Sequence, residues 1–360
     1  MNEKLPLVSI AIPNYNYGKY LRRCLDSILK QTYPNIEIIV QDNNSKDESY
    51  EILREYERRS FEGEIRPYIN IGRNKRNVGS ARNSLIVEGR AEGEYLVFLS
   101  SDDALKEHFV ERCVQVLEKN LNVGMVMVHR DEIDENDNLH ETIPFFDRDF
   151  IAEGESQAAV FMMAGVAVPS QIMIRKKVRD QSMRNRNYSF QIAGDWYSNF
   201  LMSCEADVAY LKEALCEYRI HSGNETNESE KKMLGIFEHF QLINVCNATA
   251  ETLHMTKCTK KYEAAVTKLA SMCVRYAHKM LCNQEEDCAR KYLYLAPVFD
   301  ETILQDERYV KLWDMIHHQK GKNLQFALEE FDQQYHLDRT ISYEPPENFR
   351  EINATGEIIS

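Results

Sequence analysis

The first half of the chain alternates between short apolar runs and segments with helical spacing of hydrophobic residues. Apolar, β-branched runs occur at residues 7–12, 36–40 and 95–99, and turn-forming residues bound each of them. Between them, residues 19–31 and 47–59 show the periodicity of amphipathic helices. This alternation of strands and helices predicts an α/β fold with a doubly wound, mostly parallel sheet.

The second half has a different pattern. Residues 231–335 show helical spacing and no strand alternation, which predicts four to six helices beginning near Ser229. The polar residues after them include Pro345 and Pro346, so we expect a loosely attached end. The predicted organisation is therefore an α/β domain (residues 1–228), a helical extension (229–336) and a polar tail (337–360).

Composition and charge narrow the class of protein. The 360 residues contain 44 Lys and Arg against 57 Asp and Glu, a formal net charge of −13 that argues against nucleic-acid binding. No window approaches 18 apolar residues, and the N-terminus does not resemble a secretion signal. Nine scattered cysteines without a C-x-x-C pair indicate reduced thiols. We therefore expect a cytoplasmic protein.

Two adjacent carboxylates, Asp102 and Asp103, directly follow the apolar run at residues 95–99. Ligands of open α/β sheets bind beyond the carboxyl ends of the strands. Carboxylates at that edge are suited to hold a hard divalent cation against a phosphate-bearing ligand. The alternative is that Asp103 caps the helix that follows, because Asp is a favoured N-cap residue.

Other polar segments follow the first two predicted strands. The loop at residues 13–18 reads PNYNYG, and Asp42 lies in the segment QDNNSKD. Asp42 is a candidate contact for a nucleobase N–H, or a turn residue that bonds its own backbone. Residues 65–87 contain no acid, and their basic cluster is a candidate diphosphate contact or a solvated surface. Its members are Arg73, Lys75, Arg76 and Arg82.

Several motifs occur in a characteristic order: IPNYN, QDNNS, NVGSARN, EGEYLVFLSSDD, AGDW and YRIH. In this order they resemble the family 2 inverting glycosyltransferases of the A-type fold, over roughly residues 5 to 225. The resemblance implies that residues 1–228 form the catalytic domain. It also implies a nucleotide-diphosphate sugar donor, with UDP favoured, a Mn²⁺ or Mg²⁺ cofactor, and a glycan or lipid-linked glycan acceptor.

The resemblance carries roles onto particular residues. Asp42 would contact the nucleobase, Arg82 would lie near the ribose or diphosphate, and Asp102 would be the chief metal ligand. Asp103 and His221 would assist Asp102 in binding the metal. The alternative for His221 is an exposed residue at the end of a strand. Ser100 departs from the family pattern, which commonly has Asp there, and implies weaker metal binding. The implied donor-binding residues are Pro13, Tyr15, Asn16, Asp42, Asn44, Arg82, Ser101 and Asp102.

Asp195, in the motif AGDW, matches the catalytic base of the family. An inverting transfer needs a base because the acceptor hydroxyl loses its proton as it attacks. The alternative is that Asp195 caps the next helix. A basic cluster at residues 175–186 is expected to face a phosphorylated acceptor, an anionic membrane at the inner face, or only solvent. The helical extension could also mediate a homo-oligomer.

Two rival functions remain. A sugar-phosphate nucleotidyltransferase has a similar sheet but normally carries a glycine- and arginine-rich loop after the first strand, which IPNYNYG does not provide. A degenerate nucleotide-sugar-binding scaffold protein without transferase activity is the non-enzyme alternative. Ser100 favours this alternative, whereas Asp102 and Asp195 argue against it.

Overall fold

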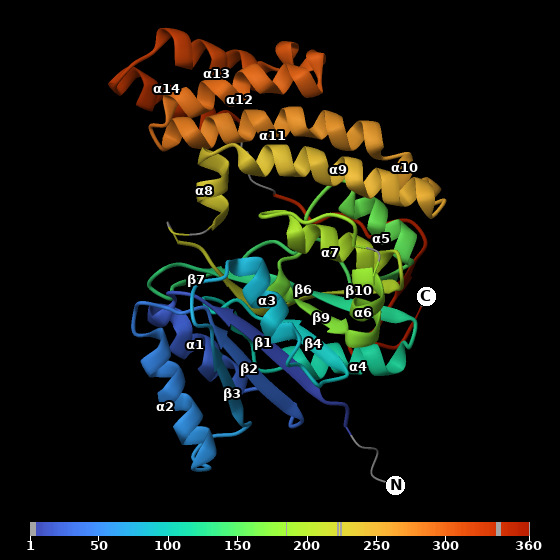
Figure 1. Ribbon diagram of the computed structural model, residues 1–360. Coiled ribbons are helices and arrows are strands. Elements are labelled where there is room, and N and C mark those ends of the chain that lie inside the picture. The colour runs from blue at the N-terminus through green and yellow to red at the C-terminus, as the bar shows by residue number, and fades with distance from the viewer. Residues whose placement is uncertain (1–4, 185, 222, 224, 336–339, 360) are drawn as a thin grey trace.

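The computed structural model describes residues 5–184, 186–221, 223, 225–335 and 340–359, and its centre is one mixed sheet (Figure 1). The strand order in this described part is β11-β8-β10-β6-β9-β4-β1-β2-β3, while β5 pairs with β10 and β7 pairs with β6. The strands are β1 (Val8–Asn14), β2 (Ile36–Asp42), β3 (Ile69–Arg73), β4 (Tyr95–Phe98), β5 (Ala104–Leu105), β6 (Val123–Ile133), β7 (Leu139–His140), β8 (Phe150–Ala152), β9 (Ile172–Arg175), β10 (Asp207–Arg219) and β11 (Phe349–Glu351).

The expected parallel pairing holds in the first half of the sheet. Strand β1 runs parallel to β2 and β4, and β2 runs parallel to β3. The second half differs, because β9 lies antiparallel between β4 and β6, and β8 and β11 are also antiparallel to their neighbours. The mostly parallel expectation is therefore wrong for β8, β9 and β11, whereas β6 and β10 run parallel to each other. A short buried strand such as β9 is apolar on both faces, so its sequence carries no signal of its direction.

Helices cover both faces of the sheet, as the alternation of side chains along each strand requires. Ile10 and Val97 point into the core under α1, α2 and α4, whereas Ala11 and Leu96 face α3. The helices of the first 205 residues are α1 (Gly18–Leu29), α2 (Ser49–Phe61), α3 (Ser80–Glu88), α4 (Phe109–Lys119), α5 (Gly154–Phe161), α6 (Lys176–Arg184) and α7 (Gly194–Ser203), with a short 3-10 helix η1 (Pro169–Gln171).

The predicted helical extension is present, with seven α-helices in its described residues instead of the expected four to six, and it stacks in layers on one side of the sheet domain (Figure 1). One continuous core joins the two parts, because Phe200 and Tyr210 belong to the same buried cluster as Leu242 and Leu269. Within the described residues, no helix has the length and apolar character needed to span a bilayer. The helices are α8 (Glu225–Lys231), α9 (Leu234–Thr252), α10 (Thr256–Thr259), α11 (Tyr262–Cys282), α12 (Glu286–Phe299), η2 (Glu301–Gln305), α13 (Glu307–His318) and α14 (Lys322–Tyr335).

The C-terminal tail is firmly attached, so the expectation of a loose end is wrong for residues 340–359. Strand β11 pairs with β8 at the edge of the sheet, and Ile352 is buried in the core. Further along, Asn120 Nδ2 donates to the Gly356 carbonyl at 2.8 Å. Backbone pairing holds this segment, and backbone hydrogen bonds are independent of the polar side-chain composition that suggested a loose tail.

Candidate functional site

The loops after β1 and β2 lock together at the carboxyl edge of the sheet. Ser45 Oγ accepts from the Asn16 N–H at 2.9 Å, and Asn16 Oδ1 accepts from the Lys46 N–H at 2.8 Å. Asn16 and Asn44 have φ values of 56° and 63°, in the left-handed region that Asn tolerates better than most residues. The asparagines of both motifs therefore shape the edge of the crevice, while Tyr15 is exposed beside them.

Asp42 holds these loops from inside. Its side chain is fully buried, and its oxygens accept from Asn14 Nδ2 at 3.1 Å and from Ser45 Oγ at 2.5 Å. The Ser45 N–H also donates to Asp42, as in the turn interpretation, and Arg73 Nε lies 3.2 Å away. A direct contact with a nucleobase therefore requires Asp42 to exchange one of these partners.

The basic cluster near β3 divides into two kinds of residue. Arg73 pairs with Asp42, donates to the Ser45 carbonyl and lies over the Tyr50 ring at 4.0 Å. Arg82, in the first turn of α3, is exposed. The next residue, Asn83, is buried and donates to the Gln41 carbonyl at 2.9 Å. Arg82 is thus placed to reach a ligand, and Asn83 anchors its helix.

Asp102 and Asp103 follow β4 as predicted, but their surroundings differ. Asp103 is buried and accepts from Ser170 Oγ at 2.6 Å and from the Arg219 N–H at 2.8 Å, one bond on each carboxylate oxygen. Burial, and then the neighbouring charge of Asp102, raises the pKa of Asp103 to about 7. Asp103 does not cap α4, which begins at Phe109 after the strand β5. Asp103 therefore stabilises the site through its hydrogen bonds, whereas the side chain of Asp102 faces the site.

The side chains of Asp102 and His221 lie next to each other at the carboxyl edge of the sheet. His221 Nε2 lies 3.2 Å from Asp102 Oδ2, and the rings of Tyr17 and Tyr20 pack against the imidazole at 5.6 and 5.3 Å. Of the three predicted metal ligands, the structure brings Asp102 and His221 together, with both side chains mostly buried.

Arg219 is a site residue that the motifs did not single out. It is fully buried, and its guanidinium donates to the carbonyls of Asp102 at 2.9 Å and Asp134 at 2.5 Å. It also pairs with Asp137 Oδ1 at 2.5 Å and lies over the Tyr20 ring. Arg219 therefore ties the acidic motif to the β6–β7 hairpin. The only indication in the sequence that Arg219 belongs to the site was its position in the motif YRIH.

The residues at the edge fit a divalent cation. Two side chains able to ligate a metal meet here, a carboxylate and an imidazole, and the carboxylate is the type of ligand that Mg²⁺ and Mn²⁺ prefer. The buried Ser101 Oγ and Asn14 Oδ1 have no hydrogen-bond partner within the described chain. Unpaired buried polar atoms in a native fold call for an external partner, so this edge has the character of a ligand site.

Asp195 lies on a different surface, in the first turn of α7. The carboxylate of Glu238, from α9, accepts from three backbone N–H groups before this helix, those of Gln191, Ile192 and Ala193, at 2.7–3.0 Å. Asp195 itself accepts from the Trp196 N–H at 2.7 Å. Glu238 of the extension thus holds the backbone just before the helix, and the N-cap residue is Ala193 and not Asp195.

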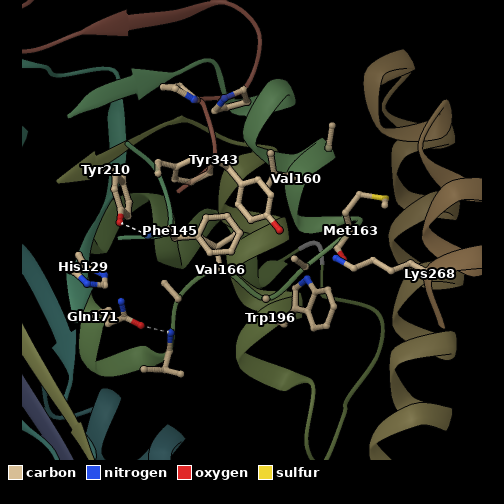
Figure 2. Close-up of a pocket in the computed structure, with 18 of the residues that line it drawn as sticks. His129, Phe145, Val160, Met163, Val166, Gln171, Trp196, Tyr210, Lys268 and Tyr343 are labelled. Atoms are coloured by element: carbon tan, nitrogen blue, oxygen red, sulfur yellow. Dashed lines mark hydrogen bonds between the residues drawn. The ribbon is translucent and has the colours of Figure 1, made fainter. Parts of the chain in front are cut away.

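Asp195 and Trp196 line a cavity of about 1810 Å³. Figure 2 shows Trp196 at the wall of this cavity. Asp102, Asp103 and His221 are not among its lining residues. The helix η1 connects the two places, because Ser170 binds Asp103 while the adjacent Gln171 lines the cavity. The predicted base and the predicted metal ligands therefore lie on two neighbouring surfaces joined by η1.

His239 lies at the cavity wall with its ring 5.0 Å from that of Trp196. Burial lowers its pKa from 6.5 to about 4, so the folded chain keeps it neutral where the unfolded chain is protonated. The unfolded state then binds more protons between these values, and stability falls as the pH falls. Between pH 7 and pH 4 we expect a loss of at most about 3 kcal/mol from this residue.

Urea unfolding of the wild type and of His239→Leu at several pH values tests this expectation. The variant should lose less stability between pH 6.5 and pH 4 than the wild type, whereas His318→Leu, at an exposed histidine of α13, should behave as the wild type. Equal acid sensitivity in His239→Leu and the wild type would contradict the assignment.

The basic cluster at residues 175–186 is partly structural. Arg175 donates to the Leu117 and Val123 carbonyls, Lys176 pairs with Asp180, and Arg179 pairs with Glu88 at 2.8 Å. These three side chains are committed to contacts within the fold. The cluster is therefore not one continuous basic face.

A second group of metal-binding residue types lies in the extension. His278 and Cys282 on α11 converge with Asp332 on α14, and their ligand atoms lie within 4.8 Å of one another. His278 Nε2 already pairs with Asp332 at 2.9 Å, and the ring stacks on Phe331. These contacts account for the cluster without an ion. All nine cysteines are free thiols, as the sequence predicted.

Comparison with known proteins defines the class. The profile of glycosyl transferase family 2 matches residues 9–211, more than half of the chain, and the chain belongs to this family. An uncharacterised glycosyltransferase of Nostoc sp. is 31% identical over 252 residues, which cover 66% of this chain and 74% of that protein. Glycosyltransferase GlyG of Streptococcus pneumoniae is also 31% identical, and the match covers 61% of this chain and 72% of GlyG.

Solved structures confirm the fold. S. aureus TarS residues 1–349 in complex with UDP-GlcNAc superimposes with a TM-score of 0.57 at 14% identity, covering 96% of both chains. The complex of the same protein with UDP gives a TM-score of 0.54 at 15% identity, covering 85% of this chain and 90% of that one. The predicted A-type glycosyltransferase fold with a C-terminal helical region is therefore confirmed.

Proposed function

We propose that this glycosyltransferase moves a sugar from a nucleotide-diphosphate donor to a glycan or lipid-linked glycan acceptor with inversion. The observation that carries the proposal is the meeting of Asp102 and His221 at the carboxyl end of β4, beside the shaped loops after β1 and β2. UDP is the favoured nucleotide, and the TarS structures that hold UDP and UDP-GlcNAc support this choice. The transferred group is then a hexose or an N-acetylhexosamine.

Asp102 and His221 would hold Mn²⁺ or Mg²⁺, which neutralises charge on the departing diphosphate when bound. Asp195 acts as the general base. The acceptor oxygen bonds to the anomeric carbon from the face opposite the nucleotide, its proton passes to Asp195, and the bond to the diphosphate oxygen breaks. Arg82 and Tyr15 lie exposed at the donor edge, where Asn16 and Asn44 set the loop shape.

A thermal-shift panel of UDP, GDP, dTDP and CDP, each with and without Mn²⁺ or Mg²⁺, tests the donor site. A nucleotide at about 100 times its Kd stabilises the folded state by roughly 2.7 kcal/mol. We expect a shift with UDP that depends on the metal and that Asp102→Asn abolishes. A shift of equal size without metal would contradict the cation site, and the absence of a shift with every nucleotide would contradict the donor site.

A further inference from the structure

The cavity beside Asp195 is built from three parts of the chain that are distant in sequence. Trp196 comes from the catalytic domain, Lys268 and Arg275 from α11, and Tyr343 from the tail. Tyr343 is fixed there because its N–H donates to the Phe145 carbonyl at 2.8 Å and its carbonyl accepts from the Asp147 N–H at 2.9 Å. The cavity therefore exists only because the extension and the tail pack on the sheet domain.

The extension contributes a basic wall to this cavity. Lys268 and Arg275 are seven residues apart in α11, so they share one face of that helix with about 10.5 Å of rise between them, and Lys261 is the N-cap residue just before its first turn. Lys257 and Lys260 add to the same wall. Among the described residues of helices α8–α14, no Asp or Glu lines the cavity, although the protein as a whole carries a formal net charge of −13.

The positive charges of this wall are only partly offset by the protein. Lys257 pairs with Glu153 at 2.5 Å, whereas Lys268 donates to a neutral group, the Met163 carbonyl, at 3.0 Å. Burial, and then the charge of Arg275, lowers the pKa of Lys268. The five acids that line the cavity belong to the sheet domain and the tail and not to the basic wall; they are Glu132, Glu141, Asp195, Glu344 and Glu347. Like charges gathered on one wall favour an anionic ligand.

The opposite side of the cavity is aromatic. Figure 2 shows Phe145, Trp196 and Tyr343 on this side, with Lys268 reaching toward them from α11. Trp196 is held by a hydrogen bond from Nε1 to the Phe161 carbonyl at 2.5 Å, and its ring lies against Gly165. Aromatic surfaces with a few polar groups are typical of sites that bind extended organic ligands such as sugars.

From this arrangement we propose that the cavity binds the acceptor, and that the acceptor is an anionic glycan bearing carboxylates or phosphodiesters. The inference rests on the proposed function, because Asp195 at the cavity wall is what links the bound glycan to the transfer. The aromatic side receives the sugar rings, and the wall formed by Lys261, Lys268 and Arg275 pairs with their acidic groups.

Fluorescence anisotropy with labelled oligosaccharides tests the inference. The probes are a hyaluronan hexasaccharide for carboxylates, a glycerol-phosphate hexamer for phosphodiesters, and maltohexaose as the neutral control. We expect at least one anionic probe to bind at least about tenfold more tightly than maltohexaose, with affinity that falls as salt is added. Which anionic probe binds identifies the acidic group.

The triple variant Lys261→Gln, Lys268→Gln and Arg275→Gln should lose about tenfold or more of this affinity. A matched triple, Lys232→Gln, Lys291→Gln and Lys320→Gln, removes the same charge from exposed sites outside the cavity and should bind as the wild type. Equal loss in both triples, stronger binding of maltohexaose, or no binding of either anionic probe would overturn the inference.

The donor thermal shift separates this inference from the proposed function. A metal-dependent UDP shift without anion binding overturns the anionic acceptor and leaves the donor site standing. Anion binding without any nucleotide shift leaves the cavity as a binding site and contradicts the transferase mechanism.

Discussion

Asp195→Asn is expected to lower the rate of sugar transfer by about 10²–10⁴-fold while leaving donor binding unchanged. The amide keeps the size of the side chain and can still accept from the Trp196 N–H, but it cannot take a proton from the acceptor hydroxyl. The start of the helix should keep its position, because Glu238 still accepts from the three backbone N–H groups that precede it.

The measurement is a coupled assay of nucleoside-diphosphate release, run with the thermal shift of the same variant with UDP and Mn²⁺. Asp287→Asn is a matched control, since Asp287 is also an exposed carboxylate in the first turn of a helix, α12. Transfer at the wild-type rate in Asp195→Asn would refute the base assignment. A loss of the UDP shift would show that Asp195 acts in donor binding.

Arg219→Met is expected to destabilise the fold by about 2–4 kcal/mol. The substitution leaves the Asp102 carbonyl without its donor at a buried position and the Asp134 carbonyl without its donor at a partly buried one. Asp137, the charged partner, is half-exposed and regains water, so most of the cost comes from the carbonyls and the lost packing against Tyr20.

Urea unfolding provides the measurement. Arg22→Met serves as the control, because the Arg22–Glu55 pair is on the surface and should contribute at most about 1 kcal/mol. At a temperature where it remains folded, Arg219→Met should also lose the metal dependence of the nucleotide shift, since Asp102 is displaced. A cost no larger than that of Arg22→Met would show that the contacts of Arg219 do not hold the site.

The sequence was informative wherever a signal is local. Strands β1, β2 and β4 are apolar runs followed by polar turns, and these determine where Asp42 and Asp102 fall at the edge of the sheet. The motif order predicted the family, which the matching profile confirms. The helical spacing of hydrophobic residues was enough to predict the helical extension. The individual roles of the site residues remain predictions.

Predictions from the sequence were wrong where a residue or segment binds a partner that is distant in the sequence. Asp103 was an N-cap candidate, yet it binds Ser170 and Arg219, which are 67 and 116 positions away. The tail suggested a loose end, yet β11 joins the sheet through backbone bonds that any side chains permit. Strand β9 gave no sign of its antiparallel direction.

The sequence by itself determined the elements, the order of the motifs and the presence of carboxylates at the strand ends, because periodicity and turn chemistry act between neighbouring residues. Only the tertiary structure decided which of two adjacent aspartates faces His221 and which binds Ser170 and Arg219. It also decided that Trp196, Lys268 and Tyr343 enclose one cavity. Burial and pairing depend on groups brought together across the whole chain, and a local pattern does not encode them.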